Sequence, residues 1–598
     1  MNALRTKEMA IALLLLCLFI FSPLSAPAAP AWPFPLTVTQ PDGTMLTVQL
    51  HGDEHFHWVT AADDSTLLVN RSNAYYVAEV SEDGFLTPTN LLAHTPQLRT
   101  ADERAAIQRQ VPRRANFMKQ GTARIEQGRR AMAITTSDNY FPHSGTPRVL
   151  VILAAYTDKP FTVENPQETF DEYFNGDQDL NYKANSNVNI CSVAKYFDTV
   201  SDGKYKPQFD VVGPVTLPND MAYYGDGNGN PSNELFKALC TDACNLVKDD
   251  VDFKDYDNNG DGTAELIYVL HAGYGENTGG PAKSMWAKCD LLNITVNGTK
   301  IAYGGCHSEL FKDAVLNGIG PFIHEFSHGM GLPDLYVTSS SSSAYKEPNQ
   351  SMQSWDVMDY GIYSNDGYAP AAYTAWEQEV FGWITINELT EPTTNISAVP
   401  LLAGGNAYKI QNPDKLNEFI VLENVQQASL NSAARGHGLL AYHIDYASSV
   451  VKMNNRPNNT KNHPRVAVIP SGGLQFSTYC IDGVTYTSDQ WASTHKATPF
   501  PGTGGITKLT DEQELPNFCF YEGDSTNKKP VGHSLYNIKE ENGVVTFDYD
   551  KNSATGIGSL TPALSKAEGA WYTLDGRRLG SEPTGKGIFI YQGKKIVK

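Results

Sequence analysis

The residues with the clearest chemical potential lie in the stretch HEFSHGMGLPD, which begins at His324. In a helix, His324 and His328 project from the same face about one turn apart, so both imidazoles can reach one metal ion. Two imidazole nitrogens at this spacing suit zinc. Glu325 directly follows the first histidine and is placed to take a proton from a zinc-bound water. The stretch therefore predicts metal-activated hydrolysis.

The residues after this helix indicate how the metal site is completed. Gly331 stands where the helix must end, because only glycine enters a left-handed turn without strain. Leu332 and Pro333 then carry Asp334 back toward the metal, and three protein ligands leave a fourth position for water. In one alternative, Asp334 only orients a ligand and another residue completes the site. In the other, this is an ordinary buried helix whose histidines are satisfied in the core.

A second motif, WDVMDYG, begins at Trp355. It resembles the Met-turn of the metzincin metalloproteases, a hydrophobic floor beneath the zinc. Tyr360, two residues after Met358, matches the position of a tyrosine near the metal in astacin- and serralysin-like metzincins. Its phenol could donate a hydrogen bond to the developing oxyanion, which makes Tyr360 a second catalytic candidate. Metzincins more commonly carry histidine in place of Asp334, and the extra negative charge would make zinc a slightly weaker Lewis acid.

A third motif, DNNGDGTAE, resembles a calcium-binding loop. EF-hand-like positions are taken by oxygens of Asp257, Asn259, Asp261, Thr263 and Glu265, with Gly262 at the sharp turn. The twelfth position is Tyr268 instead of a bidentate glutamate, and a strand follows, so the loop is not an EF-hand. We predict a structural Ca²⁺ here. The alternative is a metal-free turn of Asn, Asp and Gly residues.

Composition and the amino terminus indicate an exported protein. The chain has 598 residues, which suggests several domains, and a formal net charge of −20, which argues against a nucleic-acid partner. Residues 1–28 are typical of a signal peptide, with Arg5 and Lys7 before an apolar run that is too short to span a membrane. Ala26-Pro27-Ala28 fits the small-residue cleavage rule. With no other apolar segment of spanning length, we expect a soluble, secreted or extracellular protein, which could be attached to the cell surface.

The pattern of elements predicts a multi-domain fold with an α/β catalytic domain. We expect a β-rich pro-segment at 29–98, a basic, partly helical linker at 99–144, and the protease domain at 145–383. The pairs Arg113-Arg114 and Arg129-Arg130 make the linker a candidate maturation site, and a solvated helix is the alternative. A β-rich accessory domain would occupy 384–550, and a linker with a C-terminal tail 551–598. Within the catalytic domain we expect one helix over 314–330. A hairpin around Asn297-Gly298 is also expected, in which Cys289 and Cys306 could be bridged.

The pro-segment contains no cysteine, so a thiol bound to zinc cannot keep the enzyme latent. A carboxylate or histidine, for example from the stretch His51 to His55, would have to occupy the metal instead. The alternative is that 29–98 is a small binding module. The last residues, from Trp571 to Lys598, resemble the C-terminal sorting tails of exported Bacteroidetes proteins, which implies secretion machinery as a partner; a simple terminal hairpin is the alternative.

Taken together, the motifs resemble the immune inhibitor A family of secreted bacterial metalloproteases, within the metzincins. The resemblance implies an extracellular zinc endopeptidase that is made as a precursor and acts on protein or peptide substrates. Two other functions fit the same residues less well. One is a calcium-stabilised surface adhesion protein with a non-catalytic zinc site, and the other is a zinc amidase acting on cell-wall peptides.

Overall fold

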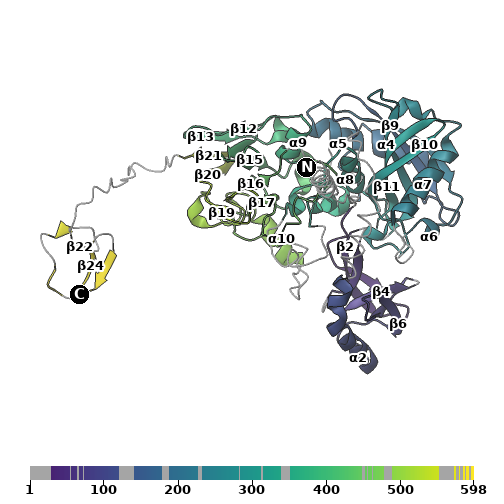
Figure 1. The fold of residues 1–598 in the computed structure, drawn as a ribbon, viewed down its shortest axis with the longest axis horizontal. Coiled ribbons are helices and arrows are strands. Elements are labelled where there is room, and N and C mark those ends of the chain that lie inside the picture. The colour runs from purple at the N-terminus through teal and green to yellow at the C-terminus, as the bar shows by residue number, and fades with distance from the viewer. Residues whose placement is uncertain are drawn as a thin grey trace, which may run out of the picture. The chain divides into compact units, whose positions relative to one another are not determined.

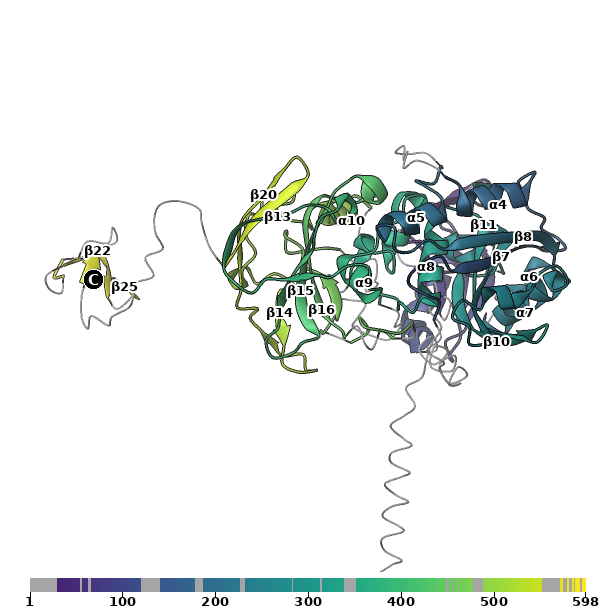
Figure 2. The same ribbon diagram turned by 90° about the horizontal axis from the view of Figure 1, so that it is seen from above.

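The computed structural model describes most of the chain in two compact units, one ending at Asn552 and the other beginning at Ser553 (Figures 1 and 2). The described residues of the first unit are 29–119, 140–177, 187–225, 232–337, 351–476 and 488–550, without 54–55, 63–65, 72, 282, 312–313, 448–450, 454 and 461. Those of the second unit are 571–573, 578–579, 583–585, 587–591 and 594–597. None of the described helices is long and apolar enough to cross a bilayer.

The first sheet is an antiparallel meander of six strands in sequence order. Its strands are β1 Leu36–Thr39, β2 Met45–Gly52, β3 His57–Ala61, β4 Leu67–Arg71, β5 Ala74–Val80 and β6 Leu86–Leu92. Helix α2 (Ala101–Gln110) packs on this sheet and continues into η1 (Val111–Arg113). The buried Gln110 amide donates to the backbone oxygens of Leu67 and Ala78, at 2.9 and 2.8 Å.

These contacts differ from the exposed linker expected from residue 99 onward. A buried amide satisfied by two strands fixes the helix to the sheet, since an unpaired polar group there would be costly. The basic pair Arg129-Arg130, on which the expected maturation site partly rested, lies outside the described residues.

The second sheet has the order β10-β11-β9-β7-β8, with β10 antiparallel at one edge and all other neighbours parallel. Its strands are β7 Arg148–Ala155, β8 Gln208–Thr216, β9 Thr263–Tyr274, β10 Lys288–Val296 and β11 Thr299–Leu310. The helices are α4 Pro166–Asn175, α5 Val193–Val200, α6 Met221–Tyr224, α7 Ser232–Val247, α8 Gly320–Gly329 and α9 Ala375–Val380, with short 3₁₀ turns η2 Phe253–Tyr256 and η3 Glu276–Thr278.

Both faces of this sheet are buried, which explains its continuous apolar strands. Val149 and Val151 of β7 enter one core together with Phe322 and Phe326 of α8. Leu150 of the same strand enters a second core with residues of α7. Residues 140–144 belong with this region, because the Phe141 amide donates to the Gly329 backbone oxygen at 2.9 Å.

Two expectations about this region were wrong. Helix α8 begins at Gly320 and not near 314. Ala314 has a φ of 59° and the chain turns back there, while Pro321 fixes the first helical turn. Cys289 and Cys306 are free thiols. Register places Cys289 opposite Gly305, so the two side chains point to opposite faces and enter different cores.

The described part of residues 384–550 forms three β-sheets. The largest has the order β12-β14-β15-β16-β17, beside sheets β13-β21-β20 and β18-β19. The strands are β12 Asn387–Glu388, β13 Thr393–Ala398, β14 Tyr408–Gln411, β15 Glu418–Val425, β16 Gly438–Asp445, β17 Val466–Val468, β18 Phe520–Tyr521, β19 Lys528–Lys529, β20 Leu535–Glu541 and β21 Val544–Tyr549. One helix, α10 (Ser488–Lys496), and the turns η8 Leu401–Ala403, η9 Ser429–Ala433 and η11 Asp511–Gln513 lie among them.

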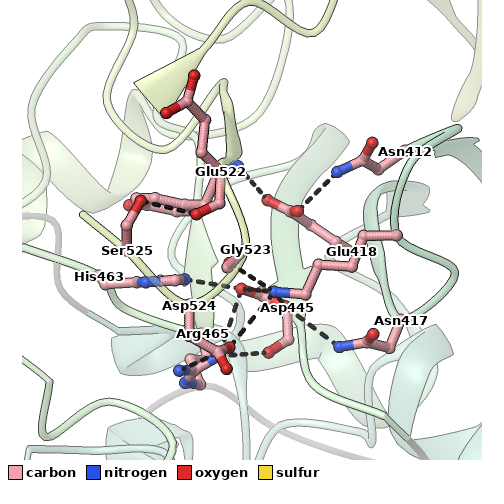
Figure 3. Close-up of polar contacts among 12 residues, drawn as sticks. Asn412, Asn417, Glu418, Asp445, His463, Arg465, Glu522, Gly523, Asp524 and Ser525 are labelled. Atoms are coloured by element: carbon pink, nitrogen blue, oxygen red, sulfur yellow. Dashed lines mark hydrogen bonds and ion pairs between the residues drawn. The ribbon is translucent and has the colours of Figure 1, made fainter. Parts of the chain in front are cut away.

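A buried ionic cluster, centred on Asp445 at the end of β16, ties the loops of this region together. His463 and Arg465 point toward the Asp445 carboxylate (Figure 3). Lys415 also contacts it, with Nζ 2.6 Å from Oδ1. The carboxylate therefore joins the turn before β15 to the loop before β17.

The second unit is a small antiparallel sheet in the order β23-β22-β24-β25. Its strands are β22 Trp571–Thr573, β23 Arg578–Leu579, β24 Ile588–Tyr591 and β25 Lys594–Val597. The tail thus has more strands than the two that its sequence indicates. Its sorting role stays a prediction.

Candidate metal centre and active site

Helix α8 brings two histidines into one buried cluster. His324 and His328 are fully buried, and their Nε2 atoms lie 3.2 Å apart. Their rings are nearly perpendicular, with centroids 4.7 Å apart. The spacing of four residues therefore places both imidazoles on one face, as the sequence predicts.

Asp334 joins this pair from the bend after the helix. Gly331 has a φ of +102°, and its amide donates to the His328 backbone oxygen at 2.8 Å, so the left-handed turn expected there is present. Oδ1 of Asp334 lies 3.3 Å from Nε2 of both histidines. The potential ligand atoms of the three residues lie within 4.8 Å of one another, and they are the only such His/Cys/Asp/Glu group among the described residues.

The hydrogen bonds of the histidines suit a cation in this cluster. Nδ1 of His324 lies 2.8 Å from the Val357 backbone oxygen, and Nδ1 of His328 lies 2.7 Å from that of Leu332. Carbonyls only accept, so each Nδ1 carries the proton and each neutral ring turns an Nε2 lone pair inward. Two lone pairs and a carboxylate oxygen then converge without a proton between them. Such an arrangement fits zinc, which takes neutral imidazoles and a carboxylate.

The ionisation of these groups agrees with that donor set. Burial lowers the pKa of His328, which favours the neutral ring. Burial raises the pKa of Asp334, but positive charge in the cluster opposes it, and protonated His328 and His324 would lower that pKa to about 2. A cation held in place of those protons would likewise keep the aspartate ionised.

The turn in which the second motif predicts a hydrophobic floor contacts the first histidine through its backbone. Met358 is fully buried, and its backbone oxygen accepts from the Leu335 amide at 2.9 Å. Val357, the preceding residue, orients His324 through its carbonyl. The turn thus holds both the helix histidine and the segment after Asp334.

A pair of buried carboxyl groups supports this floor. Asp356 accepts from the Met358 amide at 2.7 Å and shares a side-chain hydrogen bond with Glu377 of α9. Burial raises the pKa of Asp356 well above its usual range and that of Glu377 to about 7. Burial likewise raises the pKa of nearby Glu423 to about 7. A proton shared between Asp356 and Glu377 allows two acids to be buried side by side.

Tyr360 begins the 3₁₀ segment η7 (Tyr360–Gly367), after the shorter turn η6 (Gln353–Trp355). Its side chain is buried in an apolar cluster with Trp286, Tyr336 and Tyr363. Of these neighbours, Tyr336 stacks on His324 with ring centroids 6.5 Å apart. Tyr360 therefore belongs to the wall of the site, and its oxyanion role stays a prediction.

Glu325 is fully buried, and its Oε1 accepts a 2.7 Å hydrogen bond from the backbone nitrogen of Ala29. Sequence reasoning missed this contact. It also missed Trp286, Asn277 and Tyr363, which form hydrogen bonds with the backbone of residues 29–32. No spacing pattern links these residues, because they lie in separate loops, and aromatic residues in such loops are ordinarily assigned to the core.

The predicted calcium loop is closed by its own backbone. Oδ1 of Asp257 accepts from the Gly260 and Asp261 amides, at 2.9 and 3.1 Å, and Oδ2 accepts from Gly262 at 2.8 Å. Glu265, at the start of β9, accepts from the amides of Asn258 and Asn259. Asn259 and Asp261 in turn accept from the amides two residues later, Asp261 and Thr263. These bonds account for the turn, so calcium stays a prediction.

His51 and Asp53, which were candidates to occupy the metal, are engaged within the first sheet. Nε2 of His51 lies 2.9 Å from the Thr60 hydroxyl, and Oδ1 of Asp53 accepts from the Phe56 amide at 3.1 Å. Glu54 and His55 lie outside the described residues.

Comparison with known proteins agrees with the location of the cluster. Residues 140–384 match the family model described as "Immune inhibitor A peptidase M6, catalytic domain". The chain is 26% identical over 274 residues to "Pre-pro-metalloprotease PrtV" of Vibrio cholerae, covering 39% of this chain and 29% of that protein. It is 24% identical over 276 residues to "Immune inhibitor A" of Bacillus thuringiensis subsp. alesti, covering 39% of each. The chain thus aligns with well under half the length of these relatives.

Proposed function

We propose that this chain is a secreted zinc endopeptidase, made as a precursor, that hydrolyses peptide bonds of extracellular proteins. The observation that carries this proposal is the convergence of His324, His328 and Asp334 beside Glu325, on one buried helix and the bend after it. This cluster lies inside the segment that matches a peptidase catalytic domain. The name of one relative, a pre-pro-metalloprotease, also supports a proteolytic function.

Zinc held by His324, His328 and Asp334 would supply Lewis acidity, which makes water a stronger acid and a peptide carbonyl a better electrophile. Glu325 accepts the proton of the attacking water on its carboxylate and then passes it to the leaving amine. Tyr360 donates a hydrogen bond to the oxyanion that develops on the substrate carbonyl. The Nδ1 contacts of the two histidines hold their rings in the tautomer that this donor set needs.

Export and calcium complete the proposal. The basic start and short apolar run of residues 1–28 favour secretion, and the tail from Trp571 favours recognition by secretion machinery. A calcium ion bound by the loop from Asp257 to Glu265 would stabilise the start of β9 without taking part in the chemistry.

Casein hydrolysis by the secreted and processed chain tests the proposal. A chelator should abolish hydrolysis and added zinc should restore it. Glu325→Gln should lower turnover at least about a hundredfold while the protein keeps its zinc, since the amide cannot accept a proton. Wild-type turnover in that variant, or hydrolysis that resists chelation, would contradict the assignment.

A further inference from the structure

The bend that carries Asp334 is held at both of its ends. Nδ1 of His328 donates to the Leu332 backbone oxygen at 2.7 Å, before Asp334 in the chain. The Leu335 amide donates to the Met358 backbone oxygen at 2.9 Å, directly after Asp334. These bonds tie the bend to helix α8 and to the turn at 355–358, so the place of Asp334 depends on how firmly the main chain at Leu335 is held.

A third contact to this bend comes from a residue far along the chain. Nδ2 of Asn458 donates to the Leu335 backbone oxygen at 2.6 Å, across 123 residues. Leu335 is fully buried, and Asn458 is 1% exposed. A buried carbonyl oxygen that loses its partner is costly, because water cannot replace the donor. The Asn458 amide therefore holds the main chain next to Asp334.

Every hydrogen-bonding position of the Asn458 amide is used. Nδ2 also donates to the Val466 backbone oxygen at 2.8 Å, and Oδ1 accepts from the amides of Arg465 and Val466 at 2.9 and 3.0 Å. Carbonyls only accept and backbone amides only donate, so these four partners allow one orientation of the side-chain amide. Asn458 therefore forms a rigid link between the bend and β17, which begins at Val466.

The ionic cluster at Asp445 fixes the chain to which Asn458 is bonded. Nε2 of His463 lies 2.7 Å and Nη1 of Arg465 lies 3.3 Å from Oδ2 of Asp445 (Figure 3). The Asp445 amide also donates to the Arg465 backbone oxygen at 2.7 Å. A continuous set of contacts thus leads from the end of β16, through residues 465 and 466, to the residue that follows Asp334.

We propose that Asn458 is a positioning residue for Asp334, and that the β-rich region after 384 thereby completes the metal centre. This inference rests on the proposed zinc site. The segment that matches a peptidase catalytic domain ends at 384, so that match does not include Asn458. Asn458 acts not as a ligand but by holding the Leu335 carbonyl. It thereby fixes the approach of the Asp334 carboxylate to the two histidines.

The zinc affinity of the full-length chain, measured by competition with graded chelators, provides the first test. Asn458→Ala should weaken zinc binding at least about tenfold, as is usual when a group that orients a metal ligand is lost. Asn517→Ala is the matched control, because Asn517 is also buried and its Nδ2 donates to the Val468 backbone oxygen of β17 at 2.8 Å. It should bind zinc as the wild type does. Wild-type affinity in Asn458→Ala, or an equal loss in both variants, would overturn the proposal.

The visible spectrum of the cobalt-substituted chain separates positioning from a general loss of stability, because its bands report the geometry of the ligands. Asn458→Ala saturated with Co²⁺ should show shifted bands, and Asn517→Ala should show those of the wild type, even if urea unfolding finds both variants equally destabilised. Unshifted bands in folded Asn458→Ala would overturn the proposal.

If Asn458→Ala did not fold, Asn458→Ser would take its place in both measurements, since serine keeps a polar group but is too short to reach the Leu335 oxygen. The same outcomes would then apply to it. If the zinc and cobalt results held but the wild type did not hydrolyse casein, only the protease function would fail.

Discussion

Nδ1 of His324 lies 2.8 Å from the backbone oxygen of Val357, although 33 residues separate them in the chain. This bond connects the helix that carries the metal-site histidines to the turn beneath them. Because a carbonyl only accepts, the bond sets the tautomer of His324 and directs its Nε2 toward His328 and Asp334. The rigidity of the turn at 355–358 therefore matters for the metal site.

The buried acid pair beneath that turn predicts a pH-dependent stability. Burial raises the pKa of Glu377 from 4.5 to about 7. A pKa that is higher in the folded state gives stability that is complete below pH 4.5 and is lost as the pH rises through 7. This rise corresponds to about 3 kcal/mol. Glu377→Gln, which can donate to Asp356 at any pH, should flatten the fall in melting temperature between pH 5 and 8.

Glu391→Gln is the control for this experiment, because Glu391 is exposed. Its melting temperature should follow that of the wild type at each pH. If Glu377→Gln lost as much stability as the wild type between pH 5 and 8, the shared proton would not be the cause.

Replacement of Asp334 distinguishes two arrangements of the metal site, one in which Asp334 binds zinc directly and one in which it only orients a ligand. If Asp334 is a direct ligand, Asp334→Ala should weaken zinc binding more than about a hundredfold. This exceeds the 10–100-fold loss typical of a residue that only orients a ligand. Zinc content after dialysis against graded competitor chelators measures the effect. Asp249→Ala, an exposed carboxylate, should bind zinc as the wild type does. A loss below tenfold in Asp334→Ala would assign the third position to another group.

The turn at Gly331 should be intolerant of a side chain. Its φ of +102° strains any other residue, and an added Cβ would lie 3.0 Å from the ring of Tyr140. We expect Gly331→Ala to cost about 1–3 kcal/mol and to weaken zinc binding, because the bend carries Asp334. Urea unfolding and zinc titration measure the two effects.

Gly382→Ala is a control for the backbone strain of a left-handed φ without a steric contact. Gly382 also has a left-handed φ, of +76°, but its added Cβ meets nothing within 4 Å. It should lose about 1 kcal/mol and keep wild-type zinc affinity. Equal losses of zinc affinity in both glycine variants would show that the effect is not specific to the bend.

The ionic cluster around Asp445 should stabilise the β-rich region after 384. Asp445 is buried, with Lys415, His463 and Arg465 within 3.3 Å. Burial opposes its ionisation, but the hydrogen bonds from His463 and Lys415 outweigh that and lower its pKa below 3.8. Its contribution is therefore present above pH 3.8 and lost as the pH falls further. Asp445→Asn should cost about 3 kcal/mol in urea unfolding at pH 7.

Asp524→Asn is the matched variant, since Asp524 contacts Lys415 and Arg465 at 3.7 and 3.5 Å but is 85% exposed. An exposed pair of this kind contributes less than about 1 kcal/mol. Comparable losses for Asp445→Asn and Asp524→Asn would mean that burial does not strengthen the cluster.

Local rules account for the features that were predictable from the residues. The repeat of the helix places His324 and His328 on one face, one turn apart. The ability of glycine to adopt a positive φ allows the bend at Gly331. The apolar strands β7 and β9, and Ser192, whose side chain accepts from the Lys195 amide at the start of α5, also depend on neighbouring residues. The start of α8 was misplaced, because the close packing of Gly318 and Gly320 against the backbone of residues 362–368 leaves no pattern in the chain itself.

By itself, the sequence determined the donor types of the metal cluster, their order, and the turn that joins them, since each depends on residues within eleven positions of one another. Only the tertiary structure decided that Val357 orients His324, that the carboxyl groups of Asp356 and Glu377 are buried, and that Ala29 reaches Glu325 across 296 residues. The reason is physical: helix and turn geometry act over neighbouring residues. Contacts between distant segments depend instead on how whole sheets and loops pack, which no local spacing encodes.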